Sequence, residues 1–250
     1  MLEILTARPL APLRHGFFTR KGGASSGVFA GLNCGPGSSD QTQVVAINRA
    51  RVAGAMGVPP EALVTVHQVH SADVAVVDGP LAAPPKADAL VTDRPGLALA
   101  VLTADCQPVL MADPAAGVVA AVHAGWRGAQ AGVLEATVDR MVELGARPER
   151  ITAVIGPTIS QAAYEVGPEF FDSFVAEHAG NARFFAQGDG DRMLFDLPGY
   201  GLERLRNAGV GRAEWTRHCT YSDPALFFSY RRARREGAAD YGRLISAIRL

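Results

Sequence analysis

Two apolar, β-prone segments in the middle of the chain are separated by a short run of turn residues. The apolar segments are residues 109–112 and 118–122, and residues 113–117 between them contain Asp, Pro and Gly. Apolar β-prone runs joined by such a connection are typical of a β-hairpin. The pattern therefore predicts two antiparallel strands in the centre of the fold.

The register of this hairpin decides whether a cysteine and a histidine face each other. Centring the pairing between Pro114 and Ala115 places Cys106 opposite His123. Side chains directly opposite each other in an antiparallel pair lie about 4.5–5.5 Å apart, which is close enough to share a ligand. A shift of one residue would turn the two side chains to opposite faces of the sheet, so their proximity depends on this register.

Hydrophobic periodicity predicts further strands and helices on both sides of the hairpin. Short β-prone runs predict strands at residues 15–20, 62–69, 73–78, 89–92, 97–103, 151–155, 213–218, 226–232 and 243–249. Helical spacing predicts helices within residues 38–57, 130–144, 168–178 and 198–208, and the first of these begins with a capping-box pattern. Hairpins mixed with single helices predict an α+β fold of mixed β-sheets covered by helices. No repeat or linker divides the chain, so we expect a single domain over residues 1–250.

Composition and charge are those of an ordinary globular protein. Of the 250 residues, 48% are hydrophobic, and the formal net charge is -1. A nearly neutral chain has no general attraction to nucleic acid or to anionic membranes, so we expect neither as a partner. No apolar run is long enough to cross a bilayer, and the N-terminus lacks a signal-peptide pattern. The three widely spaced cysteines, Cys34, Cys106 and Cys219, favour reduced thiols and a cytoplasmic protein.

Cys106 and His123 are the strongest candidates for chemistry. His123 ends a predicted strand just before the Gly-rich turn at residues 124–128. In a thiol hydrolase, a histidine removes the proton from a cysteine and the thiolate attacks the substrate. With a second histidine, the thiolate and two imidazoles instead form a three-ligand site with an open position, as in catalytic zinc sites, and the same set of ligands also describes a copper site. His70, on the same face of a predicted strand as Gln68, is the candidate second histidine. These residues alone leave the two interpretations about even.

Basic residues close to glycines indicate where an anion would bind. Arg20 and Lys21 precede a Gly-rich loop at residues 22–27, which resembles a phosphate-binding loop but lacks the Walker spacing. Arg127 lies at the start of the helix expected after the Gly-rich turn, where backbone N–H groups and the helix dipole also attract anions. Arg231 and Arg232 are weaker candidates, because a solvated basic segment explains them equally well.

Six motifs in order along the chain are TRKGGASSGVFAGLNCG, QVH, ADALVTDRPGLALAVLTADC, VVAAVHAGWRG, IGPTISQAAYEVG and CTYSDPALFFSYRR. Together they resemble the YfiH family, also called the laccase-domain or polyphenol-oxidase family. The resemblance implies a single α+β domain, a metal site of His70, Cys106 and His123, and an enzyme that acts on purine nucleosides. Members of the family are described as phosphorylases of adenosine, inosine, guanosine and methylthioadenosine, with adenosine deamination as a second activity. One departure is Tyr241, which stands where a threonine is more usual.

The resemblance leads us to expect a zinc-dependent enzyme whose partners are purine nucleosides and inorganic phosphate. In phosphorolysis, phosphate would attack C1′ of the ribose, and Arg20, Lys21 and Arg127 would neutralise its charge. In deamination, the zinc would activate a water molecule. Asp105 would either transfer a proton or orient a metal-binding histidine through its second nitrogen. Phe227, Phe228 and Tyr230 are candidates for a stacking face, although aromatic residues in a strand more often belong to the core.

Three other functions are compatible with the same residues. A copper-dependent polyphenol oxidase is one, although six histidines in the whole chain are too few for a multicopper cluster within one subunit. A second is an amide hydrolase that edits a cell-wall precursor with Cys106 and His123. The third is a binding domain with a structural metal, which would require a fourth protein ligand.

Overall fold

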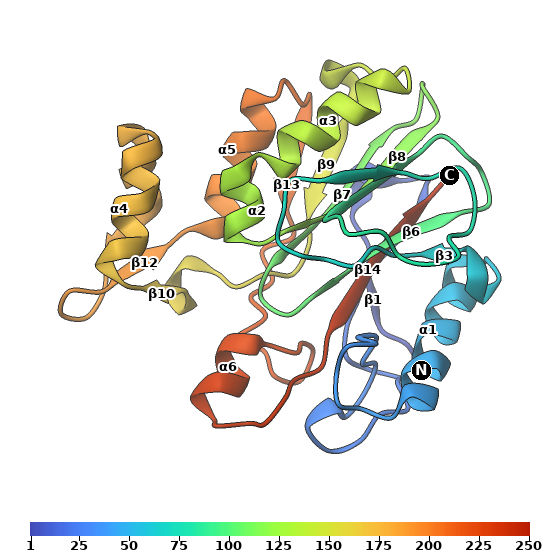
Figure 1. Cartoon of the computed structure of the whole chain (residues 1–250), viewed down its shortest axis with the longest axis horizontal. Coiled ribbons are helices and arrows are strands. Elements are labelled where there is room, and N and C mark those ends of the chain that lie inside the picture. Colours follow the sequence, from blue (N-terminus) through green and yellow to red (C-terminus); the bar gives the residue numbers. More distant parts are fainter.

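The computed structural model describes all 250 residues, and two large β-sheets packed against each other form its centre (Figure 1). The five-stranded sheet contains, in spatial order, β1 (Ile4–Leu5), β2 (Arg14–Phe18), β14 (Leu244–Arg249), β6 (Ala98–Thr103) and β3 (Leu63–Val64). The six-stranded sheet contains β13 (Arg212–Trp215), β9 (Thr152–Ile155), β7 (Gln107–Asp113), β8 (Val118–Ala124), β5 (Ala89–Thr92) and β4 (Val74–Val76). A small third sheet consists of β10 (Glu165–Val166), β12 (Met193–Phe195) and β11 (Phe185–Gln187).

Both large sheets are mixed. The pairs β3–β6, β4–β5 and β13–β9 are parallel, whereas their other pairs are antiparallel. This arrangement confirms the predicted α+β fold with mixed β-sheets. The predicted central hairpin is present as β7 and β8, and every residue of these two strands is buried.

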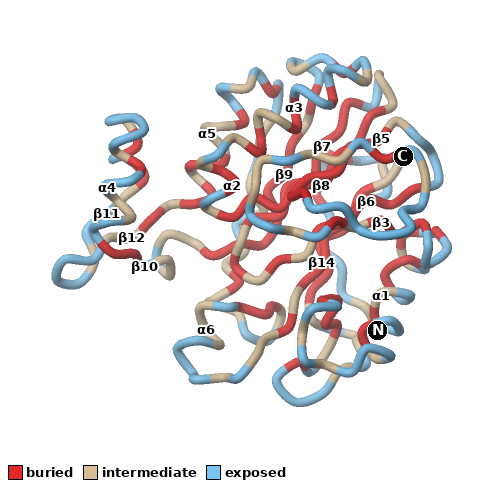
Figure 2. Tube along the Cα trace, viewed as in Figure 1, coloured by how far each residue is buried: buried red, intermediate tan, exposed pale blue.

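Burial of both faces of β7 explains why its sequence is apolar throughout. Leu110 and Ala112 point into the core between the two large sheets. Val109 and Met111 point to the other face, where they belong to a second core with α2 (Trp126–Ala131), α3 (Val133–Glu143) and α5 (Leu197–Asn207). Side chains of a strand alternate between its two faces, so a strand covered on both sides needs an apolar residue at every position. Figure 2 shows this buried centre in red.

Helices cover the sheets on opposite sides of the molecule. In Figure 1, α2, α3 and α5 lie along one face of the six-stranded sheet, and α1 (Thr42–Met56) lies near β3 and β14. Val52, Ala53 and Met56 of α1 belong to the core between the two large sheets. No helix of the structure has the length and the apolar character that are needed to cross a membrane.

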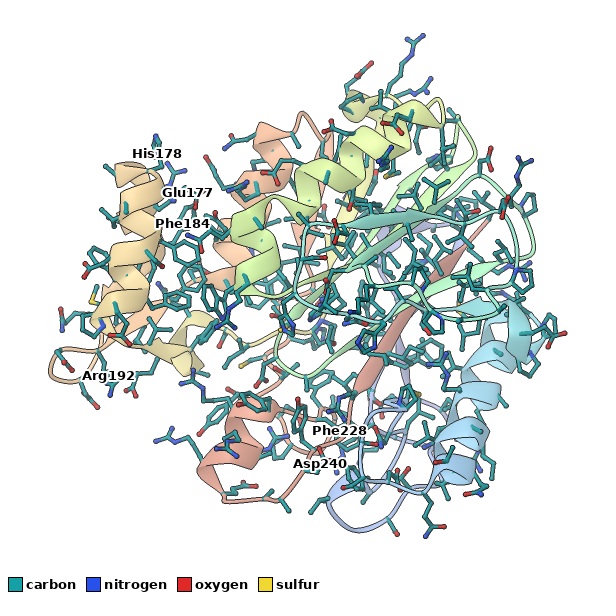
Figure 3. The ribbon with its side chains drawn as sticks, in the orientation of Figure 1. Glu177, His178, Phe184, Arg192, Phe228 and Asp240 are labelled. Atoms are coloured by element: carbon teal, nitrogen blue, oxygen red, sulfur yellow. The ribbon has the colours of Figure 1, made fainter.

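The third sheet and α4 (Pro168–Glu177) project from one side of the main body (Figure 1). Aromatic packing connects them to α5, because the rings of Phe174 and Tyr200 lie 5.1 Å apart. At the end of α4, Glu177 accepts a hydrogen bond from Arg204 of α5 at 3.0 Å, and Figure 3 shows Glu177, His178 and Phe184 in this region. The strands of the third sheet were not predicted, since they are only two or three residues long.

The strand predicted at residues 62–69 ends after Val64. Beyond it, the side-chain amide of Gln68 pairs with the backbone of Leu102 in β6, as a neighbouring strand would. It donates to the Leu102 carbonyl at 2.7 Å and accepts from the Leu102 N–H at 2.8 Å. His70 has a φ of 62°, which no β-strand adopts. The prediction that Gln68 and His70 share one face of a strand is therefore wrong.

The strand predicted at residues 226–232 is also wrong, because α6 (Tyr230–Arg235) occupies its second half. The Ser229 side chain caps this helix by accepting a hydrogen bond from the N–H of Arg232 at 3.2 Å, and serine is a favourable N-cap residue. The single helix predicted at residues 130–144 is two helices, α2 and α3. Gly132 separates them with a φ of 93°, a conformation that glycine adopts without steric cost.

The capping-box pattern at residues 38–41 does not act as a cap. Helix α1 begins at Thr42, and its N-cap residue Gln41 makes no side-chain hydrogen bond to the helix. Asp40 instead accepts hydrogen bonds from Ser25 at 2.6 Å and from Asn33 at 3.0 Å. A tertiary contact thus replaces the local one.

Candidate metal centre

The structure brings His70, Cys106 and His123 together from three separate segments. His70 lies in the loop between β3 and β4, Cys106 directly precedes β7, and His123 lies near the end of β8. Their potential ligand atoms all lie within 4.8 Å of one another. The Cys106 Sγ is 3.9 Å from the His70 Nε2, and the two imidazole rings meet edge to face with centroids 4.8 Å apart.

The hairpin register differs from the predicted one, but it preserves this contact. His123 pairs with Pro108 rather than with Cys106, and Gln107 pairs with Ala124. Relative to the prediction, one strand is therefore shifted by two residues. A shift by an even number leaves each side chain on its original face, so Cys106 lies diagonally next to His123 just beyond the end of the paired strands.

Asp88 connects the two histidines. This carboxylate is fully buried, and its Oδ1 lies 2.8 Å from the His123 Nδ1. The same carboxylate accepts hydrogen bonds from the backbone N–H groups of Val69, His70 and Ser71 at 3.1, 3.0 and 2.6 Å. One side chain therefore fixes the loop that carries His70 and directs the His123 Nε2 toward Cys106.

Asp88 has the low pKa that is expected of a carboxylate that supports metal ligands. Burial alone would raise the pKa of Asp88, but the hydrogen bonds from His123, Ser71 and His70 lower it to about 2. A carboxylate that binds the second nitrogen of a metal-binding histidine orients its ring and raises its basicity. From the sequence, this role was one of two alternatives for Asp105, and nothing in the local sequence distinguishes Asp88 from an ordinary strand-end residue.

The donor set fits a metal ion. Burial would raise the pKa of the Cys106 thiol, but the imidazoles of His123 and His70 lower it below its ordinary value. Burial would lower the pKa of His123, whereas Cys106 and Asp88 raise it. A thiolate and two imidazoles match the ligands of catalytic zinc sites, and the cluster can hold one metal ion.

Close packing surrounds this cluster on one side. A β-carbon added at Gly125 would lie 2.9 Å from the Cys106 Sγ and 3.0 Å from the His70 Cδ2. The Gly-rich turn after β8 thus leaves the space that the thiol and the imidazole occupy. On the other side, the three side chains line a cavity of about 670 Å³, which is large enough for a small organic substrate.

Asp105 lines the same cavity but contacts neither histidine. Its carboxylate accepts hydrogen bonds from the Thr220 hydroxyl at 2.6 Å, the Ser229 hydroxyl at 3.0 Å and the Arg231 N–H at 2.6 Å. Only 7% of Asp105 is exposed, and burial raises its pKa despite these bonds. Of the two roles considered for Asp105, orienting a metal-binding histidine is therefore wrong, because all partners of its carboxylate lie in the C-terminal segment. Proton transfer by Asp105 stays a prediction.

Of the three predicted phosphate-binding residues, only Arg127 lines the cavity next to Cys106. Arg20 donates hydrogen bonds to the carbonyls of Ala30 and Pro224. Its guanidinium lies 4.3 Å from the ring centroid of Phe228, in a separate cavity of about 200 Å³ that Asp240 also lines. Figure 3 shows Phe228 and Asp240 beside α6.

Lys21 is exposed and lines neither cavity. The predicted role of Arg20 and Lys21 in the site is thus wrong, because the loop that carries them packs away from the cluster.

The aromatic candidates divide between core and cavity. Phe227 and Phe228 are buried with Leu244 in a small hydrophobic cluster, so they belong to the core. Tyr230 lines the cavity, together with Tyr241, whose ring lies 5.1 Å away. Tyr241 therefore places a second aromatic ring in the cavity.

Comparison with known proteins gives consistent matches over the whole chain. The family model described as "Multi-copper polyphenol oxidoreductase laccase" matches residues 14–250. "Purine nucleoside phosphorylase" of Deinococcus radiodurans is 43% identical over 249 residues, which cover 100% of this chain and 93% of the relative. "Purine nucleoside phosphorylase YfiH" of Shigella flexneri is 42% identical over 219 residues, which cover 88% of each chain.

Solved structures show the same fold. Neisseria meningitidis protein NMB0706 superposes with a TM-score of 0.90 at 37% identity, over 100% of this chain and 98% of that one. The hypothetical protein YfiH of Bacillus licheniformis superposes with a TM-score of 0.91 at 33% identity, over 99% and 96% of the two chains.

Proposed function

Because this chain belongs to the laccase-like YfiH family, we propose that it is a zinc-dependent purine nucleoside phosphorylase. The observation that carries the proposal is a single cavity that contains both the His70–Cys106–His123 cluster and the guanidinium of Arg127. Relatives at 42–43% identity bear the name purine nucleoside phosphorylase. An open three-ligand cluster next to a cation is suited to a reaction in which an anion meets a polarised substrate.

In this proposal, His70, Cys106 and His123 hold the zinc ion, which supplies Lewis acidity when bound. The chain's own contribution is to fix the ligands before the substrate arrives. Asp88 holds the His123 ring through Nδ1 and holds the His70 loop through backbone N–H groups. Ligands that are held in place by such contacts need little reorganisation during the reaction.

The remaining cavity residues bind and orient the two substrates. Arg127 attracts the phosphate, which attacks C1′ of the ribose while the purine leaves with the electrons of the glycosidic bond. Tyr230 and Tyr241 offer aromatic surface for the purine base, since planar bases stack favourably on such rings. Holding both substrates in one cavity supplies the proximity that a two-substrate reaction needs.

The proposed substrates are adenosine, inosine, guanosine and methylthioadenosine, and the proposed second activity is deamination of adenosine. Support for deamination comes from the donor set, because a zinc ion with three protein ligands leaves room for water activation. The same His₂Cys set also suits copper. Metal analysis of the purified protein distinguishes the two, and a single copper site would give the protein a visible colour.

The test of this function is product identification with purified protein of known metal content. We expect adenosine and inosine to give free base and ribose 1-phosphate only when inorganic phosphate is present. Conversion of adenosine to inosine without phosphate would report the deaminase activity separately. If fully metal-loaded protein released neither free base nor inosine from these nucleosides, the proposed function would be abandoned.

A second candidate function, amide hydrolysis, has one specific observation in its favour. His123 contacts both a carboxylate and a thiol: its Nδ1 lies 2.8 Å from the Asp88 Oδ1, and one of its ring nitrogens lies within 4.8 Å of the Cys106 Sγ. This is the order of a carboxylate–histidine–cysteine triad. Metal-free protein that hydrolyses amides of cell-wall precursors, and loses this activity when Cys106 is alkylated, would support this function over phosphorolysis.

A further inference from the structure

Two arginines line the cavity in the same way, each against an aromatic ring. The guanidinium of Arg127 lies 4.3 Å from the ring centroid of Trp126, and that of Arg231 lies 5.4 Å from the ring centroid of Tyr164. All four side chains line the cavity that contains Cys106. An aromatic neighbour restrains the guanidinium plane while leaving its N–H groups available to a ligand.

Neither arginine has its charge neutralised by the protein. Arg231 donates one side-chain hydrogen bond, from Nη1 to the Glu165 carbonyl at 2.7 Å, and Arg127 donates none. The other arginine of the cavity, Arg243, lies 4.0 Å from the Asp240 carboxylate. Guanidinium groups without a carboxylate partner in a cavity are suited to an anionic ligand, and phosphate is the anion that their planar N–H pattern matches.

Asp105 fixes Arg231 relative to the metal centre. The buried carboxylate accepts the backbone N–H of Arg231 at 2.6 Å and the hydroxyl of Ser229, the N-cap residue of α6, at 3.0 Å. Asp105 directly precedes Cys106 in the chain and has a φ of 84°, a strained value for a residue other than glycine. The first turn of α6 is therefore tied to the residue next to the thiol.

Tyr164, the aromatic neighbour of Arg231, offers a further polar group in the cavity. Burial raises the pKa of Tyr164, so its hydroxyl group keeps its proton and can donate a hydrogen bond. The hydroxyl makes no hydrogen bond within the chain, although Tyr164 lines the cavity. It is thus a donor without a partner in the cavity that the two guanidinium groups also line.

We infer that Arg127 and Arg231 hold the phosphate co-substrate between them, with the Tyr164 hydroxyl as a third donor and Asp105 as the residue that positions Arg231. This inference rests on the proposed phosphorolysis and deepens it. In this inference Arg231, rather than Arg20 or Lys21, binds phosphate together with Arg127. Arg231 is thus a binding residue and not merely part of a solvated basic segment. Phosphate bound at this point lies beside Cys106 and hence beside the metal centre.

The test compares Arg231→Gln with Arg234→Gln. Arg234 is an exposed residue of the same helix, and its side chain makes no hydrogen bond or ion pair. For Arg231→Gln, we expect the KM for phosphate to rise about 10- to 100-fold, which is the loss expected for a charge-assisted hydrogen bond. The KM for inosine should change less than about twofold, Arg231→Lys should restore part of the phosphate affinity, and Arg234→Gln should resemble the wild type. Equal KM values for phosphate in Arg231→Gln and Arg234→Gln would overturn the inference.

Calorimetric titration of the zinc-loaded protein with inorganic phosphate gives a readout that does not depend on turnover. Phosphate should bind the wild type and bind Arg231→Gln at least about 10-fold more weakly. If the wild type bound phosphate through Arg231 but formed no ribose 1-phosphate, the anion site would stand and the proposed function would fail. If Arg231→Gln weakened binding of adenosine 5′-monophosphate but not of inorganic phosphate, the site would hold a nucleotide phosphate, and the inference would be wrong.

The positioning role of Asp105 has its own readout. In Asp105→Asn, an NH₂ group that cannot accept a hydrogen bond replaces one carboxylate oxygen, so either Thr220 or the pair of Ser229 and Arg231 loses its acceptor. The negative charge beside the first turn of α6 is lost in both cases. We expect the KM for phosphate to rise while zinc content and the KM for inosine remain near the wild-type values. Ser229→Ala removes the hydrogen bond from the Ser229 hydroxyl to Asp105 but leaves the carboxylate in place. It should therefore give a smaller rise in the KM for phosphate. An unchanged phosphate KM in both folded variants would exclude the positioning role.

Discussion

Replacement of Cys106 by alanine is expected to remove both the bound metal and the nucleoside turnover. Cys106 supplies the only thiolate of the cluster, and its Sγ lies 3.9 Å from the His70 Nε2. Without it, two imidazoles remain, which form a much weaker site for zinc. Loss of a supporting contact alone costs 10- to 100-fold in affinity or activity at metal sites, so loss of a ligand should lower turnover by more than about 100-fold. Metal content by mass spectrometry and release of free base are measured on the same preparation.

Cys219→Ala is the matched control for this variant. Cys219 is also a partly exposed free cysteine, but it does not line the cavity and its Sγ accepts hydrogen bonds from Ser160 and Ser222. It should therefore keep full metal content and full turnover. Should Cys106→Ala keep both as well, the metal mechanism is excluded. A Cys106→Ala protein that keeps its metal but loses turnover would instead indicate a nucleophilic thiol.

Asp88→Asn should weaken metal binding although Asp88 is not a ligand. The carboxylate accepts bonds from His123 and from three successive backbone N–H groups. An asparagine offers one acceptor oxygen and points N–H groups at the remaining donors, so at least one buried donor loses its partner. We expect zinc affinity to fall about 10- to 100-fold and the free energy of unfolding to fall by about 1.5–3 kcal/mol.

Zinc affinity is measured by competition with a chelator, and stability by urea unfolding of the metal-free protein. Asp73→Asn serves as the control, because its side chain is exposed in the same loop and supports neither histidine. Wild-type zinc affinity in Asp88→Asn would contradict the role assigned to this carboxylate. A loss of stability without a loss of affinity would limit that role to holding the loop at residues 69–71.

The proximity of Cys106 and His123 was predictable because the relevant signals are local, whereas His70 was predicted as the third ligand from the resemblance to the family. The apolar runs of β7 and β8 and the turn between them indicate the hairpin, and the hairpin brings Cys106 close to His123. The register was predicted with an error of two residues, since several residues of the Asp-Pro-Ala-Ala-Gly connection can form the turn. The period of two along a strand made the error harmless, because Cys106 and His123 remained on one face.

Asp88 and Asp105 could not be assigned from the sequence for a different reason. Each carboxylate is defined by partners that are distant in the chain: Asp88 binds His123, and Asp105 binds Thr220, Ser229 and Arg231. Asp105 was the more obvious candidate for orienting a ligand because it directly precedes Cys106 in the sequence. The fold places Asp88 there instead, because β5 is the direct neighbour of β8 in the six-stranded sheet.

The arginines considered for phosphate binding show most clearly how little the local sequence can predict here. The Gly-rich loop after Arg20 has the composition of an anion-binding loop. The Arg20 guanidinium, however, donates its hydrogen bonds to the backbone carbonyls of Ala30 and Pro224. Arg231 lies in a basic run that is typical of a solvated surface, and the hydrogen bond to Asp105 places it at the cavity. Helix α6 was also mistaken for a strand, so the direction of Arg231 could not be predicted.

The most direct test of the central claim is titration of zinc into metal-depleted protein while phosphate-dependent release of free base from inosine is measured. The three donor side chains together can hold one metal ion per chain. The rate should therefore be near zero without zinc, rise in proportion to the zinc added, and reach its maximum at one zinc ion per chain. A full rate of base release in metal-free protein would contradict the claim that His70, Cys106 and His123 form the catalytic metal centre of a phosphorylase.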